Sequence, residues 1–140
     1  MGKRTFAPGF RLSPLDVVVL IAGAVGAFVA SGTNPWFGIA IAFVVGHFFL
    51  FCNVLRMPRP LELVWAAAFC VLAAGAILLR VPSWPLALGL SLAITISVAC
   101  VHLRHPSYHG VGWRTLNPRL PQWWAQHIEQ STEISDDSPA

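Results

Sequence analysis

The sequence predicts an all-α integral membrane protein with four transmembrane helices, arranged as two antiparallel hairpins with both termini cytoplasmic. Four apolar stretches occupy the chain between residues 15 and 103, and each approaches the ~20 residues that cross a ~30 Å hydrocarbon layer. Apolar residues make up 56% of the 140 residues and charged residues 11%, which leaves too little polar surface for a water-soluble domain. All of the 9 Lys and Arg residues except Arg80 fall on one side of this arrangement.

The four predicted helices follow one another with only short connections. They span residues 15–30, 36–55, 61–79 and 84–103, with outer loops at 31–35 and 80–83 and an inner loop at 56–60. Connections this short make sequential helices antiparallel neighbours. Each helix has a proline near its start, where the missing N–H is tolerated; these prolines are Pro14, Pro35, Pro60 and Pro85.

Polar residues at the helix starts predict N-caps. Asn34 and Ser83 precede the second and fourth helices, where a side-chain oxygen accepts a hydrogen bond from a free backbone N–H. Ser13 precedes the first helix and Asp16 follows it by one helical turn, which predicts a capping box at the membrane boundary. A capping role accounts for Asp16 without any further function.

The basic residues decide the predicted orientation, because Lys and Arg in short loops stay on the cytoplasmic side. They precede the first helix, lie between the second and third, and follow the fourth: Lys3, Arg4, Arg11, Arg56, Arg59, Arg104, Arg114 and Arg119. Tryptophans at both boundaries predict interfacial anchors; these are Trp36 and Trp84 outside, and Trp65, Trp113, Trp123 and Trp124 inside. We expect a multi-pass protein of the bacterial cytoplasmic (inner) membrane.

The N-terminal segment also has features of a cleavable signal peptide. It combines a basic start, a short apolar run and the small residues Ala30, Ser31 and Gly32. If cleavage followed Ala30, however, Phe28 would occupy a position where a small residue is needed. We therefore expect the first helix to be retained.

Small residues at a spacing of four occur in every predicted helix. Helices in lipid associate through close van der Waals contact, which small side chains permit. Each stripe therefore predicts a packing face, either inside the bundle or toward a partner subunit. The stripes are Ala22, Gly26 and Ala30; Gly38, Ala42 and Gly46; Ala66, Cys70 and Ala74; and Gly89, Ala93 and Ser97.

His47 is the clearest polar residue inside a predicted span, and such residues commonly mark functional sites. It lies about 12 Å from the inner boundary, at the depth of Cys70, Thr95 and Ser97. One interpretation is a metal or proton site in this layer. The other is a neutral imidazole that packs beside Gly46 and hydrogen-bonds one neighbour. We expect the ring to face inward, toward Cys70 or Ser97.

A second polar layer lies nearer the cytoplasmic boundary. It contains Cys52 and Asn53 on the second helix and Cys100 on the fourth. None of the 3 cysteines falls in an outer loop, so we expect small buried thiols and no structural disulfide. Glu62 lies at the start of the third helix beside Arg59. We expect its carboxylate to interact favourably with the positive end of the helix dipole.

Three histidines at the end of the fourth helix form a candidate metal site. His102 and His105 lie one turn apart, and His109 returns toward them after the turn begun by Pro106. Three imidazoles are a set that zinc accepts. The alternative is that these histidines contact lipid phosphates at a basic membrane boundary.

The same segment carries a motif that points to a different chemistry. Arg104, His105, Pro106, Tyr108 and Gly110 spell R-H-P-x-Y-x-G. This pattern resembles one in the membrane methyltransferases that act on isoprenylcysteine and phospholipids, and it covers seven residues. The resemblance implies a cytoplasmic S-adenosylmethionine site, with Arg104, His105, Tyr108 and Gly110 as candidate cofactor-binding residues.

The chain after the fourth helix divides into two parts. We expect residues 1–110 to form the transmembrane domain, 111–130 a Trp-rich interfacial segment and 131–140 a disordered acidic tail. A short helix over 121–130 would press Trp123, Trp124, His127 and Ile128 into the headgroup region.

The sequence places no charged residue deep in a predicted span and shows no convergent pair of ionisable groups. The leading hypothesis is therefore a non-catalytic accessory or scaffolding subunit of a membrane complex, with no cofactor and no nucleic-acid partner. Its partners would be the lipid bilayer and other membrane subunits, or a second copy of the chain. Two alternatives are an S-adenosylmethionine-dependent methyltransferase-like protein and a small dimeric transporter.

Overall fold

The computed structural model describes residues 8–127, which contain only helices and connecting segments. Four of the helices are long and apolar enough to cross a membrane. The elements are α1 (Pro14–Ser31), α2 (Pro35–Phe49), η1 (Leu50–Leu55), α3 (Arg59–Ala74), η2 (Gly75–Leu79), α4 (Trp84–Leu103) and α5 (Trp113–Leu116). A further helical stretch covers residues 120–127.

Local sequence signals account for the helix starts. Ser13 Oγ accepts from the Asp16 N–H at 3.3 Å, and Asp16 Oδ2 accepts from the Ser13 N–H at 2.7 Å, so the predicted capping box is confirmed. Asn34 Oδ1 accepts from the Trp36 N–H at 3.0 Å, as predicted. Ser83 occupies the N-cap position of α4 as predicted, but its side chain makes no capping hydrogen bond.

The second and third spans both end in a π-helical turn, η1 and η2. Each turn is closed by an arginine with positive φ, 50° at Arg56 and 60° at Arg80, a region that favours glycine. The backbone N–H of Arg56 reaches the carbonyl of Phe51, and that of Arg80 reaches the carbonyl of Gly75. Each turn therefore marks the end of its span, and a short connection leads to the next helix.

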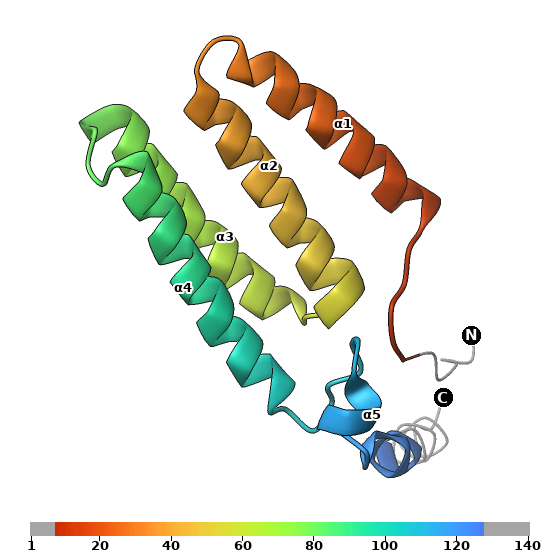
Figure 1. Ribbon diagram of the computed structural model, residues 1–140. Coiled ribbons are helices and arrows are strands. Elements are labelled where there is room, and N and C mark those ends of the chain that lie inside the picture. Colours follow the sequence, from red (N-terminus) through yellow and green to blue (C-terminus); the bar gives the residue numbers. More distant parts are fainter. Residues whose placement is uncertain (1–7, 128–140) are drawn as a thin grey trace, which may run out of the picture.

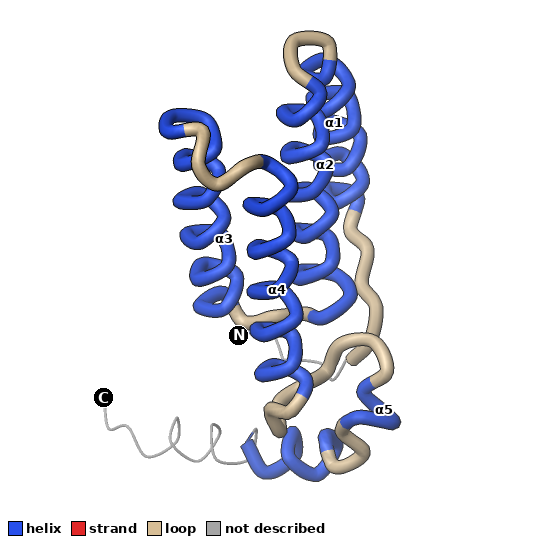
Figure 2. Tube along the Cα trace, turned by 60° about the vertical axis from the view of Figure 1, so that its left-hand side comes forward, coloured by secondary structure: helices blue, strands red, loops and turns tan. Residues whose placement is uncertain are grey.

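The four long helices do not contribute equally to the core. In Figure 1, α1 lies along α2, and α3 lies along α4; Figure 2 gives the same pairing from another side. Phe51, Met57, Trp65 and Val98, from the α2, α3 and α4 region, form the buried cluster. No residue of α1 is buried. The core therefore belongs to α2, α3 and α4, with α1 attached to the outside of α2.

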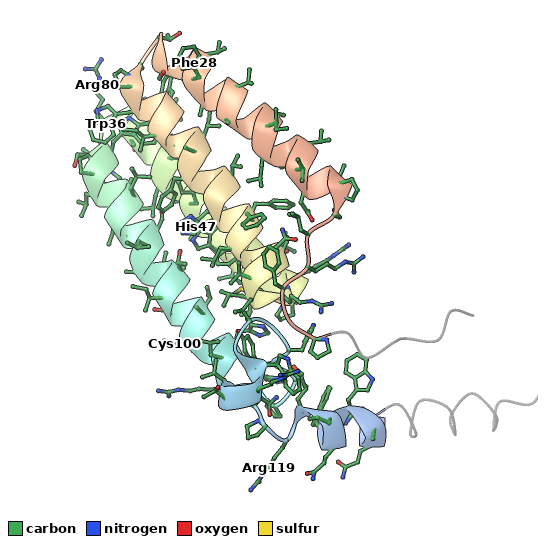
Figure 3. All side chains as sticks on the ribbon, turned by 45° about the vertical axis from the view of Figure 1, so that its right-hand side comes forward. Phe28, Trp36, His47, Arg80, Cys100 and Arg119 are labelled. Atoms are coloured by element: carbon green, nitrogen blue, oxygen red, sulfur yellow. The ribbon has the colours of Figure 1, made fainter. Side chains whose placement is uncertain are left out.

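Arginines distinguish the two ends of the helices. Arg11, Arg56 and Arg104 adjoin the helix ends near η1, which we call the basic end. Arg80 follows η2 at the opposite end, which we call the Arg80 end (Figure 3).

The contact between α1 and α2 uses a small-residue face one position away from the predicted one. A Cβ added to Gly23 would lie 2.6 Å from Val45 Cγ2, and one added to Gly38 would lie 2.6 Å from the Ala27 carbonyl oxygen. A Cβ on Gly26 would meet no atom within 4 Å. The side of α1 in close contact with α2 is thus Gly23 and Ala27, and the predicted stripe through Gly26 is not the close contact.

The predicted stripe on α4 is also displaced. The buried side of α4 is Ala87, Ser91, Thr95, Val98 and His102. Several small residues predicted to pack are instead exposed: Ala22, Ala42, Gly46, Cys70, Ala74, Gly89, Ala93 and Ser97. On α4, the side that bears Ser91 and Thr95 is turned toward Trp65, which leaves Gly89, Ala93 and Ser97 of the predicted stripe exposed.

The remaining helix surface is apolar and exposed. Large side chains point outward all along the spans, including Leu15, Phe28, Val71 and Ile96. Phe28, for example, is 81% exposed. A helix surface of this composition is suited to acyl chains.

The position of the α1–α2 contact gives the first prediction. Gly38→Ala places a methyl group against backbone of α1, which cannot move as a side chain can, so we expect a loss of about 1–3 kcal/mol in stability. Gly26→Ala is the matched control, because its added methyl group meets open space. The measurement is the apparent unfolding temperature in mild detergent. Equal effects of the two substitutions would contradict the observed packing face.

Candidate functional site

His47 lies on the inner side of α2, with only 8% of its surface exposed (Figure 3). Its Nδ1 donates to the Phe43 carbonyl oxygen at 2.7 Å, which requires the proton to be on Nδ1 in the neutral ring. Nε2 is then a lone-pair acceptor, and it is buried without a hydrogen-bond partner. The ring faces inward, but the expected partners Cys70 and Ser97 lie on exposed sides of their helices.

Trp65 is the direct neighbour of His47. The two rings stack with centroids 4.6 Å apart and planes 10° from parallel. Trp65 Nε1 donates to Thr95 Oγ1 at 2.8 Å and is 3.3 Å from the Ser91 carbonyl oxygen. The predicted role of Trp65 as an interfacial anchor is therefore corrected: the indole is 5% exposed, because α4 supplies partners for its N–H inside the bundle.

Two hydroxyls of α4 complete this group, which we call the His47–Trp65 cluster: His47, Trp65, Ser91 and Thr95. Thr95 Oγ1 donates to the Ser91 carbonyl at 2.9 Å, and Ser91 Oγ donates to the Ala87 carbonyl at 2.8 Å. Sequence analysis predicted Thr95 at this depth but missed Ser91. The signal that finds Ser91 is a second stripe of small residues with spacing four, Ala87, Ser91 and Thr95, beside the predicted one.

Aromatic rings enclose the cluster. Phe43 lies 4.1 Å and Phe51 5.7 Å from the His47 ring centroid, and Phe69 stacks on Trp65 at 5.5 Å. These apolar rings surround the side of His47 that carries the unpartnered Nε2. Within the described residues, the ring thus makes one hydrogen bond and several aromatic contacts.

A second polar group joins three helices near the basic end. The Asn53 side-chain amide, oriented so that both its atoms are satisfied, donates to Asp16 Oδ2 at 3.0 Å and to the Arg11 carbonyl oxygen. Cys52 Sγ donates to Glu62 Oε1 at 3.4 Å. Asp16 thus caps α1 and also holds η1, a role that sequence analysis did not predict. Glu62 likewise has a tertiary partner in Cys52.

The histidines after α4 do not converge. His102 Nε2 donates to the Leu55 carbonyl at 3.1 Å, His109 Nδ1 donates to the Ser107 carbonyl at 2.8 Å, and His105 Nδ1 lies 2.7 Å from Ser107 Oγ. Within residues 8–127, no group of three His, Cys, Asp or Glu side chains is placed to hold a metal. The predicted metal site of His102, His105 and His109 is therefore wrong, because the turn at Pro106 directs each ring to a different partner.

The R-H-P-x-Y-x-G segment is divided between two environments. Tyr108 is 1% exposed, and its hydroxyl donates to the Val111 carbonyl at 2.6 Å; burial raises the pKa of this phenol above its ordinary value. Gly110 is also buried. Arg104 and His105 are exposed and line a shallow cavity of about 430 Å³.

Gly110 and the residue after it complete the end of the second span. The Val111 N–H donates to the Val54 carbonyl at 2.8 Å, and a Cβ on Gly110 would lie 2.6 Å from that same oxygen. Together with the bond from His102 to Leu55, these contacts satisfy carbonyls that the end of a helix leaves free. Residues 102–111 therefore close the basic end of η1.

The remaining predicted anchors lie near the two ends. Trp36 and Trp84 are half-buried at the starts of α2 and α4. Trp113 opens α5, and Trp123 stacks on His127 with centroids 4.0 Å apart in the stretch 120–127. Trp124 is half-buried in the same stretch. The predicted end of this helix and the predicted acidic tail fall at 128–140, outside the described residues.

Four apolar spans and a buried polar cluster define the chain as a multi-pass α-helical membrane protein. Comparisons with protein-family models, with curated proteins and with solved structures find no match.

The free Nε2 of His47 gives a prediction that separates a structural histidine from a ligand-binding one. His47→Phe keeps the stack on Trp65 and removes a buried acceptor without a partner, so we expect the apparent unfolding temperature to be equal or higher. Trp65→Phe removes the donor to Thr95, and we expect a loss of about 1–3 kcal/mol. A large loss in His47→Phe would instead show that Nε2 binds a partner in the folded protein.

The docking of residues 102–111 onto η1 gives a further prediction. Gly110→Ala forces a methyl group into the Val54 and Leu55 carbonyls, so we expect the segment to open more often and trypsin to cleave after Arg104 or Arg114 about tenfold faster. Val111→Ala is the control, since it shortens a partly exposed side chain and keeps the N–H. Unchanged cleavage in Gly110→Ala would contradict the closing role of this segment.

Proposed function

We propose that the protein is a non-catalytic subunit of a membrane complex, which binds neighbouring helices through small-residue faces. One observation carries this proposal: small residues of α2 and α4 are exposed where residues 8–127 offer no partner. They are Ala42 and Gly46 on α2, and Gly89, Ala93 and Ser97 on α4. A Cβ at Gly46 or Gly89 would meet no atom within 4 Å.

Gly46 and Gly89 support the proposal because glycine lowers the stability of a helix. A glycine inside a helix is less stable than alanine by roughly 0.5–1 kcal/mol. At Gly38 this cost is offset by close contact with α1, but no contact among the described residues requires glycine at Gly46 or Gly89. In lipid, exposed small-residue stripes let a second helix approach closely and gain dispersion contacts. A partner helix on these faces therefore accounts for both glycines.

The buried polar groups support a scaffold. Trp65 joins α3 to α4 through Thr95, and Asp16 joins α1 to η1 through Asn53. Such interhelical hydrogen bonds fix the relative positions of helices in a membrane. A rigid arrangement of this kind presents the exposed faces in constant geometry.

The proposed topology is two antiparallel hairpins in the bacterial inner membrane with both termini cytoplasmic. The positive-inside rule supports it, because Arg11, Arg56, Arg59 and Arg104 adjoin one set of helix ends and Arg80 adjoins the other.

A second candidate function has one observation in its favour. The cavity of about 430 Å³ beside α4 is lined by Arg104, His105 and Pro106 of the R-H-P-x-Y-x-G motif. Binding of S-adenosylmethionine to the purified protein would support a methyltransferase-like activity over the scaffold.

The decisive experiment compares complexes extracted in mild detergent from the native membrane. We expect Gly46→Leu or Gly89→Leu to lower recovery of the partner at least tenfold, which corresponds to about 1.4 kcal/mol of association free energy. The control is Ala24→Leu, a similar enlargement on the exposed side of α1 away from both stripes. The proposal fails if wild-type protein is recovered alone, or if both glycine variants keep their partners.

A further inference from the structure

The Arg80 end contains a cavity of about 460 Å³ that lies outside the His47–Trp65 cluster and both exposed stripes. It opens between the starts of α2 and α4 and the turn that follows η2. Figure 3 shows two of its lining residues, Trp36 and Arg80, near one another at this end. Its volume is in the range of cavities that hold small ligands.

The walls of the cavity are aromatic. Trp36 and Phe37 come from the first turn of α2, and Trp84 comes from the start of α4. Phe37 and Trp84 meet edge to face with centroids 6.0 Å apart, which joins the two helix starts. Tryptophans at a helix start are typical of the headgroup level of a bilayer.

The polar side chains that line the cavity can each donate a hydrogen bond. Asn34 Oδ1 is occupied by the Trp36 N–H, which leaves the NH₂ group of the amide to donate. Ser83 makes no capping hydrogen bond, so its hydroxyl is available. Arg80 contributes a guanidinium, and no carboxylate is among the described residues that line the cavity.

The backbone holds Arg80 in place. Its φ of 60° and the bond from its N–H to the Gly75 carbonyl fix the Cα at the rim of the cavity. Arg80 is the arginine of the turn between η2 and α4, at the end opposite to Arg11, Arg56 and Arg104. A guanidinium and two tryptophan rings that line one cavity suit an anion that carries apolar substituents.

We propose that this cavity binds the phosphate of an anionic phospholipid from the adjacent leaflet. Arg80 pairs with the phosphate oxygens, Asn34 and Ser83 donate to the remaining phosphate or glycerol oxygens, and Trp36 and Trp84 flank the first methylene groups of the lipid. A zwitterionic headgroup binds less well, because no carboxylate lining the cavity receives its cation.

The test is native mass spectrometry of the full chain in detergent, titrated with phosphatidylglycerol or with phosphatidylcholine. We expect phosphatidylglycerol to bind at least tenfold more tightly, and Arg80→Asn to remove that preference. Asparagine is chosen because it tolerates positive φ, and an unchanged unfolding temperature verifies the fold. Arg119→Asn, which removes an exposed arginine that does not line the cavity, is the control and should keep the preference.

A second arm separates lipid from free phosphate. Excess inorganic phosphate should leave bound phosphatidylglycerol in place, because the tryptophans hold its apolar part. Displacement by inorganic phosphate would overturn the lipid assignment in favour of a soluble anion. Equal binding of the two lipids, or an unchanged preference in Arg80→Asn, would overturn the site itself. If Arg80→Asn lowers the unfolding temperature, Ser83→Ala is the replacement variant, with a severalfold loss expected and no loss contradicting the proposal.

Discussion

The burial of Trp65 is the constraint on which most of the described structure depends. An indole N–H cannot be left unpaired inside lipid-facing helices, so α4 must present an acceptor at its depth. Thr95 provides it at 2.8 Å, and this requirement sets the rotation of α4. The ring of His47 stacks on the Trp65 ring, which brings α2 into the same core. α1 has no part in this contact and lies outside it.

The need to pair buried polar groups also applies to the end of the second span. A π-helical turn closes the second span, and its last carbonyls need donors where little water reaches. His102, from α4, and Val111, from the following turn, supply them. In the motif that resembles a methyltransferase sequence, the Tyr108 hydroxyl donates to the Val111 carbonyl, and Gly110 packs against the Val54 and Leu55 carbonyls. His102 and Gly110 thus both contact the last carbonyls of the second span.

Function is proposed for the surfaces that this core leaves free. Because α4 is rotated toward Trp65, Gly89 and its neighbours of the small-residue stripe are exposed. Because Arg80 follows η2 with a positive φ, its side chain lines the cavity at the starts of α2 and α4. The proposed helix-binding face and the proposed anion-binding cavity therefore lie at different positions along the helices, one on the exposed side of α4 and the other at the Arg80 end.

The sequence by itself determined the four apolar spans, their short connections and the capping at Ser13 and Asn34, because these depend on local composition and on neighbouring residues. It also identified His47 as a residue of interest. The tertiary structure alone decided which face of each helix is buried. Small residues occur on more than one face of α1 and α4, and spacing cannot choose between them. Hydrogen bonding to a distant indole and steric fit against Val45 made that choice, and both connect residues far apart in the chain.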